Sequence, residues 1–300
     1  MPGAGIWPLL VGTGVLLGLS IPIAKAAAAA GVPALAYALW PAALASGVLA
    51  LLAARRRGAW RPSLPLLRYA AISGFLGHAA PMTAVFWVSA QAGAGFASLA
   101  FTLTPVTTLA ISLLVRHERF SALRALAVAI GFSGALVLVL GRGESMHAAT
   151  AAVLLVPLIP IFIGGGNVYR ALHTPPGTPA EWLAALSLAA SSAMLLAAGA
   201  ATGTLAFAPG VEAFAWIGAQ ALAMVVGYGM YFELIRRAEP VTFSFMGYVM
   251  MLTGVAVGVG LFGERLPLSA APALLLIATA FLMIHRATRI TPRNTSATIP

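Results

Sequence analysis

Charged residues divide this chain into predominantly apolar runs, each about long enough to cross a bilayer. A membrane core of about 30 Å needs about 20 apolar residues per helix. Only 8% of the 300 residues are charged and 61% are hydrophobic, whereas about a quarter of a soluble domain is charged. We therefore expect an all-α integral membrane protein. Segmentation at charges, prolines and glycine clusters predicts ten spans, at residues 6–29, 33–54, 66–89, 93–115, 122–141, 149–169, 180–201, 211–234, 240–262 and 268–286.

The connections between these runs are short, so almost no sequence remains for a soluble domain. We expect residues 288–300, which are polar, to form a disordered cytoplasmic tail. The first run is atypical of a secretory signal, because MPGAG carries no positive charge and Pro22 and Lys25 interrupt the apolar sequence. The AKA and AAA triplets nevertheless resemble a cleavage site, so a signal peptide stays open as an alternative.

The placement of lysine and arginine predicts the orientation of the chain. A formal net charge of +10 would suit nucleic acid, but these arginines stand between apolar runs rather than on one water-exposed face. With a cytoplasmic N-terminus, fourteen of the seventeen basic residues fall on the cytoplasmic side, Arg142 and Arg265 fall outside, and Lys25 lies inside or near the edge of span one. Basic residues accumulate in cytoplasmic loops. We predict that both termini are cytoplasmic, that the number of spans is even and that no nucleic acid binds.

Two stretches of the sequence resemble each other at an offset of 146 residues. VRHERFSALRALAVAIGFSGALVLVL (115–140) matches LFGERLPLSAAPALLLIATAFLMIH (261–285), which places Glu118 on Glu264. We expect both glutamates to brace tight turns by pairing with nearby arginines or with helix N-termini.

Nearly the same offset relates the first and sixth spans, where IPIAKA falls on GNVYRA and Lys25 on Arg170. We predict two five-span repeats, residues 1–145 and 146–287. Because five is odd, the second repeat is inverted. Inverted repeats are typical of secondary transporters, which hold their substrate near the membrane midplane between the halves. We therefore expect a central cavity formed by spans one, three, four, six, eight and nine.

Residues that weaken a helix gather at corresponding places in spans one and six. Proline removes a backbone donor and glycine loosens a helix. In lipid, the freed carbonyls must be satisfied by protein or by cavity water. We interpret both spans as broken helices that line the cavity and act as hinges; kinking for packing is the alternative. The residues are Gly18, Ser20 and Pro22 in span one, and Pro157, Pro160, Gly164, Gly165 and Gly166 in span six.

Together these features resemble the drug/metabolite transporter superfamily and, within it, the EamA-type repeat. The resemblance rests on ten spans in two halves, on GLSIPIAKA, on TP at 104–105, and on ER with a short polar linker before spans five and ten. It covers roughly residues 6 to 286 and is most similar to the YddG-type exporters of aromatic amino acids.

The resemblance implies an inner-membrane protein of bacteria that exports aromatic amino acids from cytoplasm to periplasm by alternating access. It also implies that Pro105 is a hinge in span four. The second repeat departs from the pattern, with GYVMM where the first has LTLTP. We therefore expect helix nine to bend less sharply than helix four. Other cargo, such as drugs, vitamins or nucleotide sugars, is the alternative on the same fold.

Lys25 is the one cation within the first apolar run. A lysine at the bilayer centre costs about 2.5–3.5 kcal/mol on insertion scales. At about 1.5 Å per residue it should sit near the outer interface, where its stem could snorkel to water. The functional alternative is that it lines an outward-open vestibule and attracts a substrate carboxylate. Its repeat partner Arg170 is expected at the cytoplasmic surface, where charge bias accounts for it; contact with substrate is the less favoured alternative.

Further candidate substrate contacts are polar or aromatic side chains inside apolar runs. His78 lies in the middle of span three, near Pro81, where a gating or proton-linked role and a local hydrogen bond are the two interpretations. Asn167 follows the glycine triplet and needs a partner, either substrate or a backbone carbonyl. Tyr228 and Tyr231 share a helix face and could stack on a planar substrate. Phe101 and Tyr248 join them as candidates, with core packing as the alternative for each aromatic.

The residue types that catalysis would need are scarce in this chain. The chain has no cysteine, and neither a metal-ligand cluster nor a phosphate-binding loop is recognisable. An integral membrane enzyme acting on lipid-linked substrates stays the less favoured alternative. The glutamates fall at span ends or in loops, which argues against carboxylate-driven proton coupling. We expect a monomer in the lipid bilayer with a small-molecule substrate and no cofactor or metal.

Overall fold

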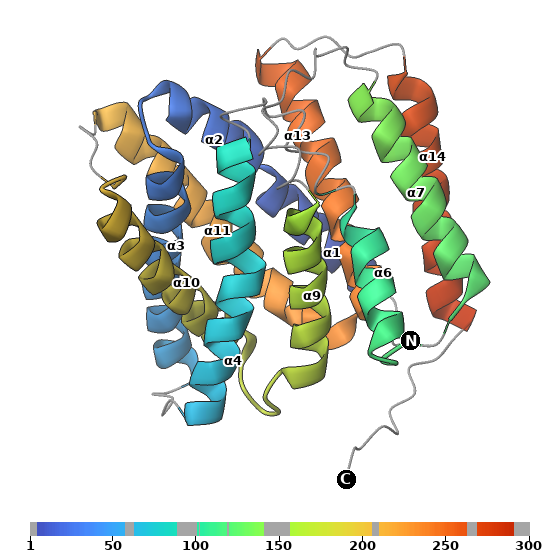
Figure 1. The fold of residues 1–300 in the computed structure, drawn as a ribbon, viewed down its shortest axis with the longest axis horizontal. Coiled ribbons are helices and arrows are strands. Elements are labelled where there is room, and N and C mark those ends of the chain that lie inside the picture. The colour runs from blue at the N-terminus through green and yellow to red at the C-terminus, as the bar shows by residue number, and fades with distance from the viewer. Residues whose placement is uncertain are drawn as a thin grey trace.

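The computed structural model describes residues 5–57, 63–88, 101, 103–118, 120–140, 157–205, 210–262 and 269–290. Within these ranges the regular structure is helical and contains no strand (Figure 1). The elements are α1 (Ile6–Gly18), α2 (Ser20–Ala29), α3 (Ala34–Arg57), α4 (Leu64–Gly74), the π-helical turn η1 (Phe75–Ala79), α6 (Thr104–Leu114), α7 (Ala122–Leu140), α9 (Leu158–His173), α10 (Ala180–Thr202), α11 (Val211–Arg237), α12 (Pro240–Ser244), α13 (Met246–Phe262) and α14 (Ala270–Ile290).

Seven stretches of the described chain are long and apolar enough to cross a membrane. Large apolar side chains also point outward, among them Val211 (89% exposed) and Leu114 (80% exposed), as a lipid-facing surface requires. The expectation of an all-α membrane protein is confirmed. The number of ten spans stays a prediction. The seven stretches are Ile6–Ala29, Ala34–Arg56, Leu64–Val88, Ala180–Thr202, Val211–Arg237, Pro240–Leu261 and Ala270–Ala287.

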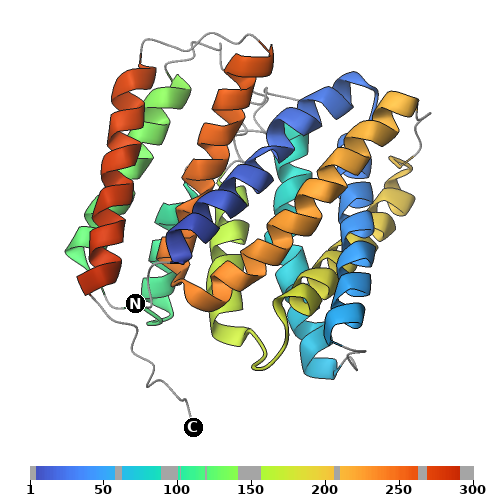
Figure 2. The same cartoon turned by 180° about the vertical axis from the view of Figure 1, so that it is seen from behind.

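Helices from the two parts of the sequence pack against each other in pairs. α7 lies along α14, α3 along α10, and α6 along α9. α1 packs on both α11 and α13, and Figure 2 shows it lying between them. The bundle is therefore held together mainly by contacts between helices that are distant in sequence. The predicted division into repeats at residues 1–145 and 146–287 stays a prediction.

Most described arginines lie at one end of the bundle, at the lower edge of Figure 1, which we call the arginine-rich end. The beginning of α1 meets the end of α14 there, where the rings of Trp7 and His285 are 4.9 Å apart. The end of α9 meets the beginning of α4, where the Tyr69 and Thr174 hydroxyls are 3.1 Å apart. Arginines at this end include Arg56, Arg68, Arg116, Arg124 and Arg237.

The structure corrects the prediction that span six is broken at its glycines. α9 runs without interruption from Leu158 to His173. A Cβ on Gly164 would lie 2.7 Å from the Thr107 hydroxyl oxygen of α6, so Gly164 allows α9 and α6 to pack closely. Thr107 donates to the Pro160 carbonyl of α9 at 2.8 Å. A hinge role for Gly164, Gly165 and Gly166 stays a prediction.

The breaks occur elsewhere. Span one is interrupted at Leu19, between α1 and α2, next to the predicted residues Gly18, Ser20 and Pro22. In the second part of the chain the interruption falls at Phe245, between α12 and α13. Pro105 occupies the first turn of α6, where its missing N–H leaves no helical acceptor unsatisfied. The comparison of helix four with helix nine falls partly outside the described residues.

The predicted tail is also corrected in part. α14 continues to Ile290, so residues 288–290 are helical, and residues 291–300 lie outside the described residues. Glu264, Arg142 and Arg265 lie outside them as well.

Candidate functional site

A cavity lies inside the bundle, enclosed by residues from both parts of the sequence. It contains about 940 Å³ of atom-free space, including the part open to solvent. The junction of α1 and α2, the π-turn η1, and helices α6, α9, α11, α12 and α13 contribute to its wall. These elements belong to the six spans expected around a cavity. The structure adds α3, through Tyr37 and Ala38.

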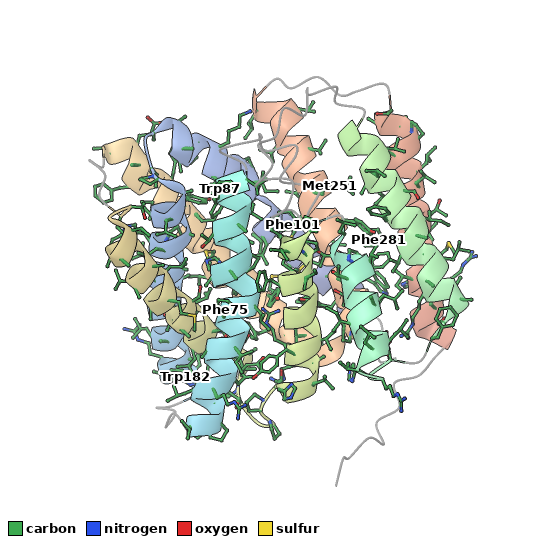
Figure 3. The ribbon with its side chains drawn as sticks, viewed as in Figure 1. Phe75, Trp87, Phe101, Trp182, Met251 and Phe281 are labelled. Carbon is green, nitrogen blue, oxygen red and sulfur yellow. The ribbon has the colours of Figure 1, made fainter. Side chains whose placement is uncertain are left out.

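Five of the seven candidate substrate contacts line this cavity, namely His78, Phe101, Asn167, Tyr228 and Tyr231. Phe101 lies toward the middle of the bundle in Figure 3, whereas Trp182 and Phe281 lie on flanking helices. The structure thus brings together residues from η1, α9 and α11, and whether they bind a substrate stays a prediction.

Lys25 and Tyr248 do not line the cavity. Lys25 is exposed on α2, and α2 lies at the end of the bundle opposite the arginine-rich end (Figure 1), which agrees with snorkelling. Tyr248 is fully buried, packed against Phe245 and Phe281 with ring centroids 5.3 and 6.5 Å apart. Its ring also fills the space over Gly131. Tyr248 therefore belongs to the core between α7, α13 and α14.

His78 joins three elements around the cavity. It lies in η1, four residues after Gly74 and three before Pro81. A proline in a helix removes one backbone donor, which favours a local π-turn. Nε2 donates to the Ala38 carbonyl of α3 at 3.1 Å. Nδ1 lies 3.1 Å from the Tyr228 hydroxyl of α11. Because a carbonyl only accepts, a neutral ring carries its proton on Nε2 and accepts from Tyr228 through Nδ1.

A second polar group at the cavity consists of Ser20, Tyr37 and Gln220; the sequence analysis named Ser20 only as a helix-weakening residue and did not single out the other two. The Tyr37 hydroxyl donates to Gln220 Oε1 at 3.0 Å or to the Ser20 carbonyl at 3.1 Å. Gln220 Nε2 donates to the Ser20 hydroxyl at 2.7 Å. The signal was present: Gln220 is a buried amide within the apolar run WIGAQALAMVV. This group connects the interruption of span one to α3 and α11.

The third polar group surrounds Arg170, whose placement corrects the expectation of a surface arginine. Arg170 is only 2% exposed. Nε donates to the Ser73 hydroxyl at 2.9 Å and Nη2 to the Ser73 carbonyl at 3.1 Å. Nη1 donates to the Tyr231 hydroxyl at 2.6 Å and to Asn167 Oδ1 at 3.4 Å. The guanidinium is buried because α9 packs against α4 and η1, where Gly77 leaves space for it.

The rest of the cavity wall is aromatic and sulfur-rich. Six rings, from three phenylalanines and three tyrosines, stand beside four methionines in the lining. Tyr228 and Tyr231 are neighbours, with ring centroids 5.4 Å apart. Methionine adapts to irregular shapes and contacts aromatic rings favourably. The described lining contains no carboxylate, so the cavity suits a solute with an apolar, planar part. The residues are Tyr37, Phe86, Phe101, Tyr228, Tyr231, Phe243, Met82, Met224, Met246 and Met250.

Below the cavity, an ion cluster joins the two parts of the chain at the arginine-rich end. Arg124 Nη1 donates to Glu118 Oε2 at 2.8 Å, and Arg124 Nη2 lies 2.5 Å from Glu239 Oε2. Glu118 Oε1 accepts from the Val241 N–H at the beginning of α12, at 3.2 Å. The expected role of Glu118 as a turn brace is confirmed. In the part of the chain that the structure describes, His, Asp and Glu form no group of three or more that could hold a metal.

Comparison with known proteins gives a family for the first part of the chain. Residues 6–140 match the EamA-like transporter family. A solved structure described as "Crystal structure of protein" is similar over 94% of this chain and 97% of its own, with a TM-score of 0.75 and 18% sequence identity. At that identity the likeness establishes the fold. Curated protein sequences gave no significant match. The family match covers less than half of the chain and shows that this first part is similar to EamA-like transporters.

Proposed function

We propose that the whole chain is an EamA-type secondary transporter that exports aromatic metabolites, aromatic amino acids in the first place. In this proposal it lies in the inner membrane of a bacterium with both termini in the cytoplasm, and solute moves from cytoplasm to periplasm. The observation that carries the proposal is the cavity itself, a large space between the two parts of the chain, lined by six aromatic rings and three polar groups.

The chemistry of the lining supports an aromatic solute. Offset-stacked or edge-to-face rings contribute about 0.5–1.5 kcal/mol beyond the area they bury, and Tyr228, Tyr231 and Phe101 offer such contacts. The hydroxyl of Tyr37 and the amides of Asn167 and Gln220 supply hydrogen-bonding groups for a polar backbone. A few placed polar groups in a mostly apolar pocket are typical of small-molecule sites.

The arrangement of the helices supports alternating access. If α1 corresponds to α9, α11 to α4 and α13 to α6, the contacts of α1 with α11 and α13 match those of α9 with α4 and α6. The two remaining pairs, α3 with α10 and α7 with α14, each join one helix from each part of the chain. Such exchanged pairs are what two inverted repeats would produce, and inverted repeats open by rocking against each other. In this proposal the Arg170 group and the Glu118–Arg124–Glu239 cluster are the contacts that would change when the cavity opens toward the arginine-rich end.

The orientation follows from the charge distribution. The arginine-rich end carries exposed Arg56, Arg68, Arg116, Arg236 and Arg237. Cytoplasmic loops carry the excess of basic residues, so this end is assigned to the cytoplasm. Lys25, at the other end, would then lie toward the periplasm.

The proposal is tested with purified protein in proteoliposomes, by counterflow of radiolabelled tryptophan, phenylalanine and leucine. Empty liposomes correct for leak. We expect the two aromatic amino acids to exchange, and leucine to exchange at least about tenfold more slowly. A tenfold difference corresponds to ~1.4 kcal/mol, which is within the contribution of ring contacts that leucine cannot form. Equal exchange of all three, or of none, would refute the aromatic assignment.

A further inference from the structure

Arg170 stands out because its charge is buried and is not compensated by an acidic residue in the described chain. The glutamates described are Glu118, Glu181, Glu212, Glu233 and Glu239, and none pairs with it. Its partners are instead the neutral oxygens of Ser73, Asn167 and Tyr231. A buried cation is costly unless an anion or a full set of acceptors accompanies it.

The acceptor set around Arg170 is incomplete. A guanidinium has five N–H donors in a planar fork, and four of them are used: one on Nε, two on Nη1 and one on Nη2. The remaining N–H of Nη2 has no acceptor among the described residues. The Tyr231 ring adds a cation–π contact, with the guanidinium carbon 5.3 Å from its centroid, which still leaves the net charge unpaired.

Arg170 does not itself line the cavity, but it lies directly behind residues that do. Three residues that touch the guanidinium, Gly77, Asn167 and Tyr231, also belong to the cavity lining. A Cβ on Gly77 would lie only 1.5 Å from Nη2. Nη2 therefore occupies the space that a side chain at residue 77 would take, and only a glycine admits it. The guanidinium is thus separated from the cavity only by the residues that contact it.

We propose that Arg170 is the carboxylate-recognition residue of this transporter, and that its solutes are small organic anions or zwitterions. A carboxylate arriving at the cavity wall between Asn167 and Tyr231 would take the unused Nη2 donor and replace the Tyr231 hydroxyl at Nη1. Two parallel N–H···O bonds of this kind are the strongest that arginine forms with a carboxylate. This inference rests on the proposed function, which supplies the cavity as the path of the solute, and it adds the chemical class of that solute.

The test compares solutes that differ only in the carboxylate. Counterflow of tryptophan and of tryptophanamide, in which an uncharged amide replaces the carboxylate, is measured for the wild type, Arg170→Gln, Arg170→Lys and Arg68→Gln. Arg68 is exposed on α4 at the same end of the bundle. Arg68→Gln therefore controls for loss of a positive charge at that end without touching the cavity.

We expect wild type and Arg68→Gln to prefer tryptophan over tryptophanamide by about tenfold or more, as one charge-assisted bidentate contact permits. Arg170→Gln should lose that preference, mainly through a higher KM for tryptophan. Arg170→Lys keeps the charge but not the fork, so it should raise the KM for tryptophan severalfold and leave kcat nearly unchanged. It serves as the decisive variant should Arg170→Gln not yield folded protein. Parallel losses for tryptophan and tryptophanamide, or an unchanged preference, would overturn the proposal.

Failure of the proposed function is distinguishable from failure of this inference. If the wild type moves neither compound, ligand-induced shifts of Tm are measured with benzoate, indole-3-acetate and succinate, each against its amide. Stabilisation of wild type by a carboxylate, reduced in the Arg170 variants and preserved in Arg68→Gln, supports anion recognition without aromatic amino acid export. Absence of any shift that depends on Arg170 refutes it.

Discussion

Arg170 on α9 and Tyr231 on α11 are joined by a hydrogen bond of 2.6 Å from Nη1 to the phenol oxygen. The same guanidinium holds Ser73 of α4 through both its hydroxyl and its carbonyl. Three helices therefore meet at one side chain, immediately behind the cavity lining. If the proposed transporter opens toward the arginine-rich end, these bonds must be exchanged for others.

Gly77 is predicted to be indispensable for this group of contacts. In Gly77→Ala the new Cβ would coincide with Arg170 Nη2, so the guanidinium must leave its partners. Overpacking of this kind costs about 1–3 kcal/mol, and we expect a lower Tm in detergent. Gly229→Ala is the matched control, because nothing lies within 4 Å of its Cβ and alanine favours a helix by about 1 kcal/mol. A Gly77→Ala variant as stable as Gly229→Ala would contradict the placement of Arg170.

The hydrogen bond between His78 and Tyr228 is predicted to stabilise the bundle. Tyr228→Phe removes the hydroxyl that Nδ1 of His78 faces and keeps the ring. A buried acceptor without its donor costs about 1–3 kcal/mol, which chemical or thermal unfolding in detergent will measure.

Tyr248→Phe provides the comparison for this prediction. The Tyr248 hydroxyl is buried and has no hydrogen-bond partner among the described residues, so its removal should be neutral or stabilising. Equal destabilisation by the two substitutions would show that ring packing, rather than the contact with His78, sets the effect.

The buried carboxylate of Glu118 predicts a pH dependence of stability. Burial raises the pKa of Glu118 above its ordinary value of 4.5, against the opposing effects of the Val241 N–H and Arg124. The folded protein then binds the proton more readily than the unfolded chain. The resulting stabilisation is fully present below pH 4.5 and is lost as the pH rises through the raised pKa.

Glu118→Gln should remove this component, so the stability of the variant relative to wild type should change across that window. Tm measured in detergent from pH 4 upward gives the comparison. Glu233→Gln, which alters a partly exposed pair with Arg237, should change stability by less than about 1 kcal/mol. A difference between wild type and Glu118→Gln that is constant with pH would be evidence against a raised pKa.

Hydropathy was sufficient to predict an all-helical membrane protein, because lipid requires long apolar runs and only a few side chains interrupt them. The same logic located His78, Asn167 and Tyr228: a polar group within an apolar run needs a partner, and a cavity is where partners meet. All three line the cavity. The sequence could not distinguish Tyr248 from the tyrosines that line the cavity. It also lies in an apolar run, but its ring packs against other rings in the core.

Arg170 shows where reasoning from local sequence stops. It lies near the end of a predicted span, where charge bias alone accounts for an arginine. Its partners Ser73 and Tyr231 are 97 and 61 residues away, and no local pattern connects them. The prediction that span six breaks at its glycines was wrong for a related reason. Whether Gly164 breaks a helix or lets another helix approach depends on a neighbour, here Thr107.

The most direct test of the central claim is to fill the cavity from one helix and compare the effect with a substitution on its outer face. Met224 lines the cavity and is 2% exposed, whereas Leu222 on the same helix is 67% exposed. Tryptophan counterflow in proteoliposomes should be abolished by Met224→Trp and preserved by Leu222→Trp, with both variants folded by size-exclusion chromatography. Undiminished counterflow in folded Met224→Trp would show that the solute does not pass through this cavity.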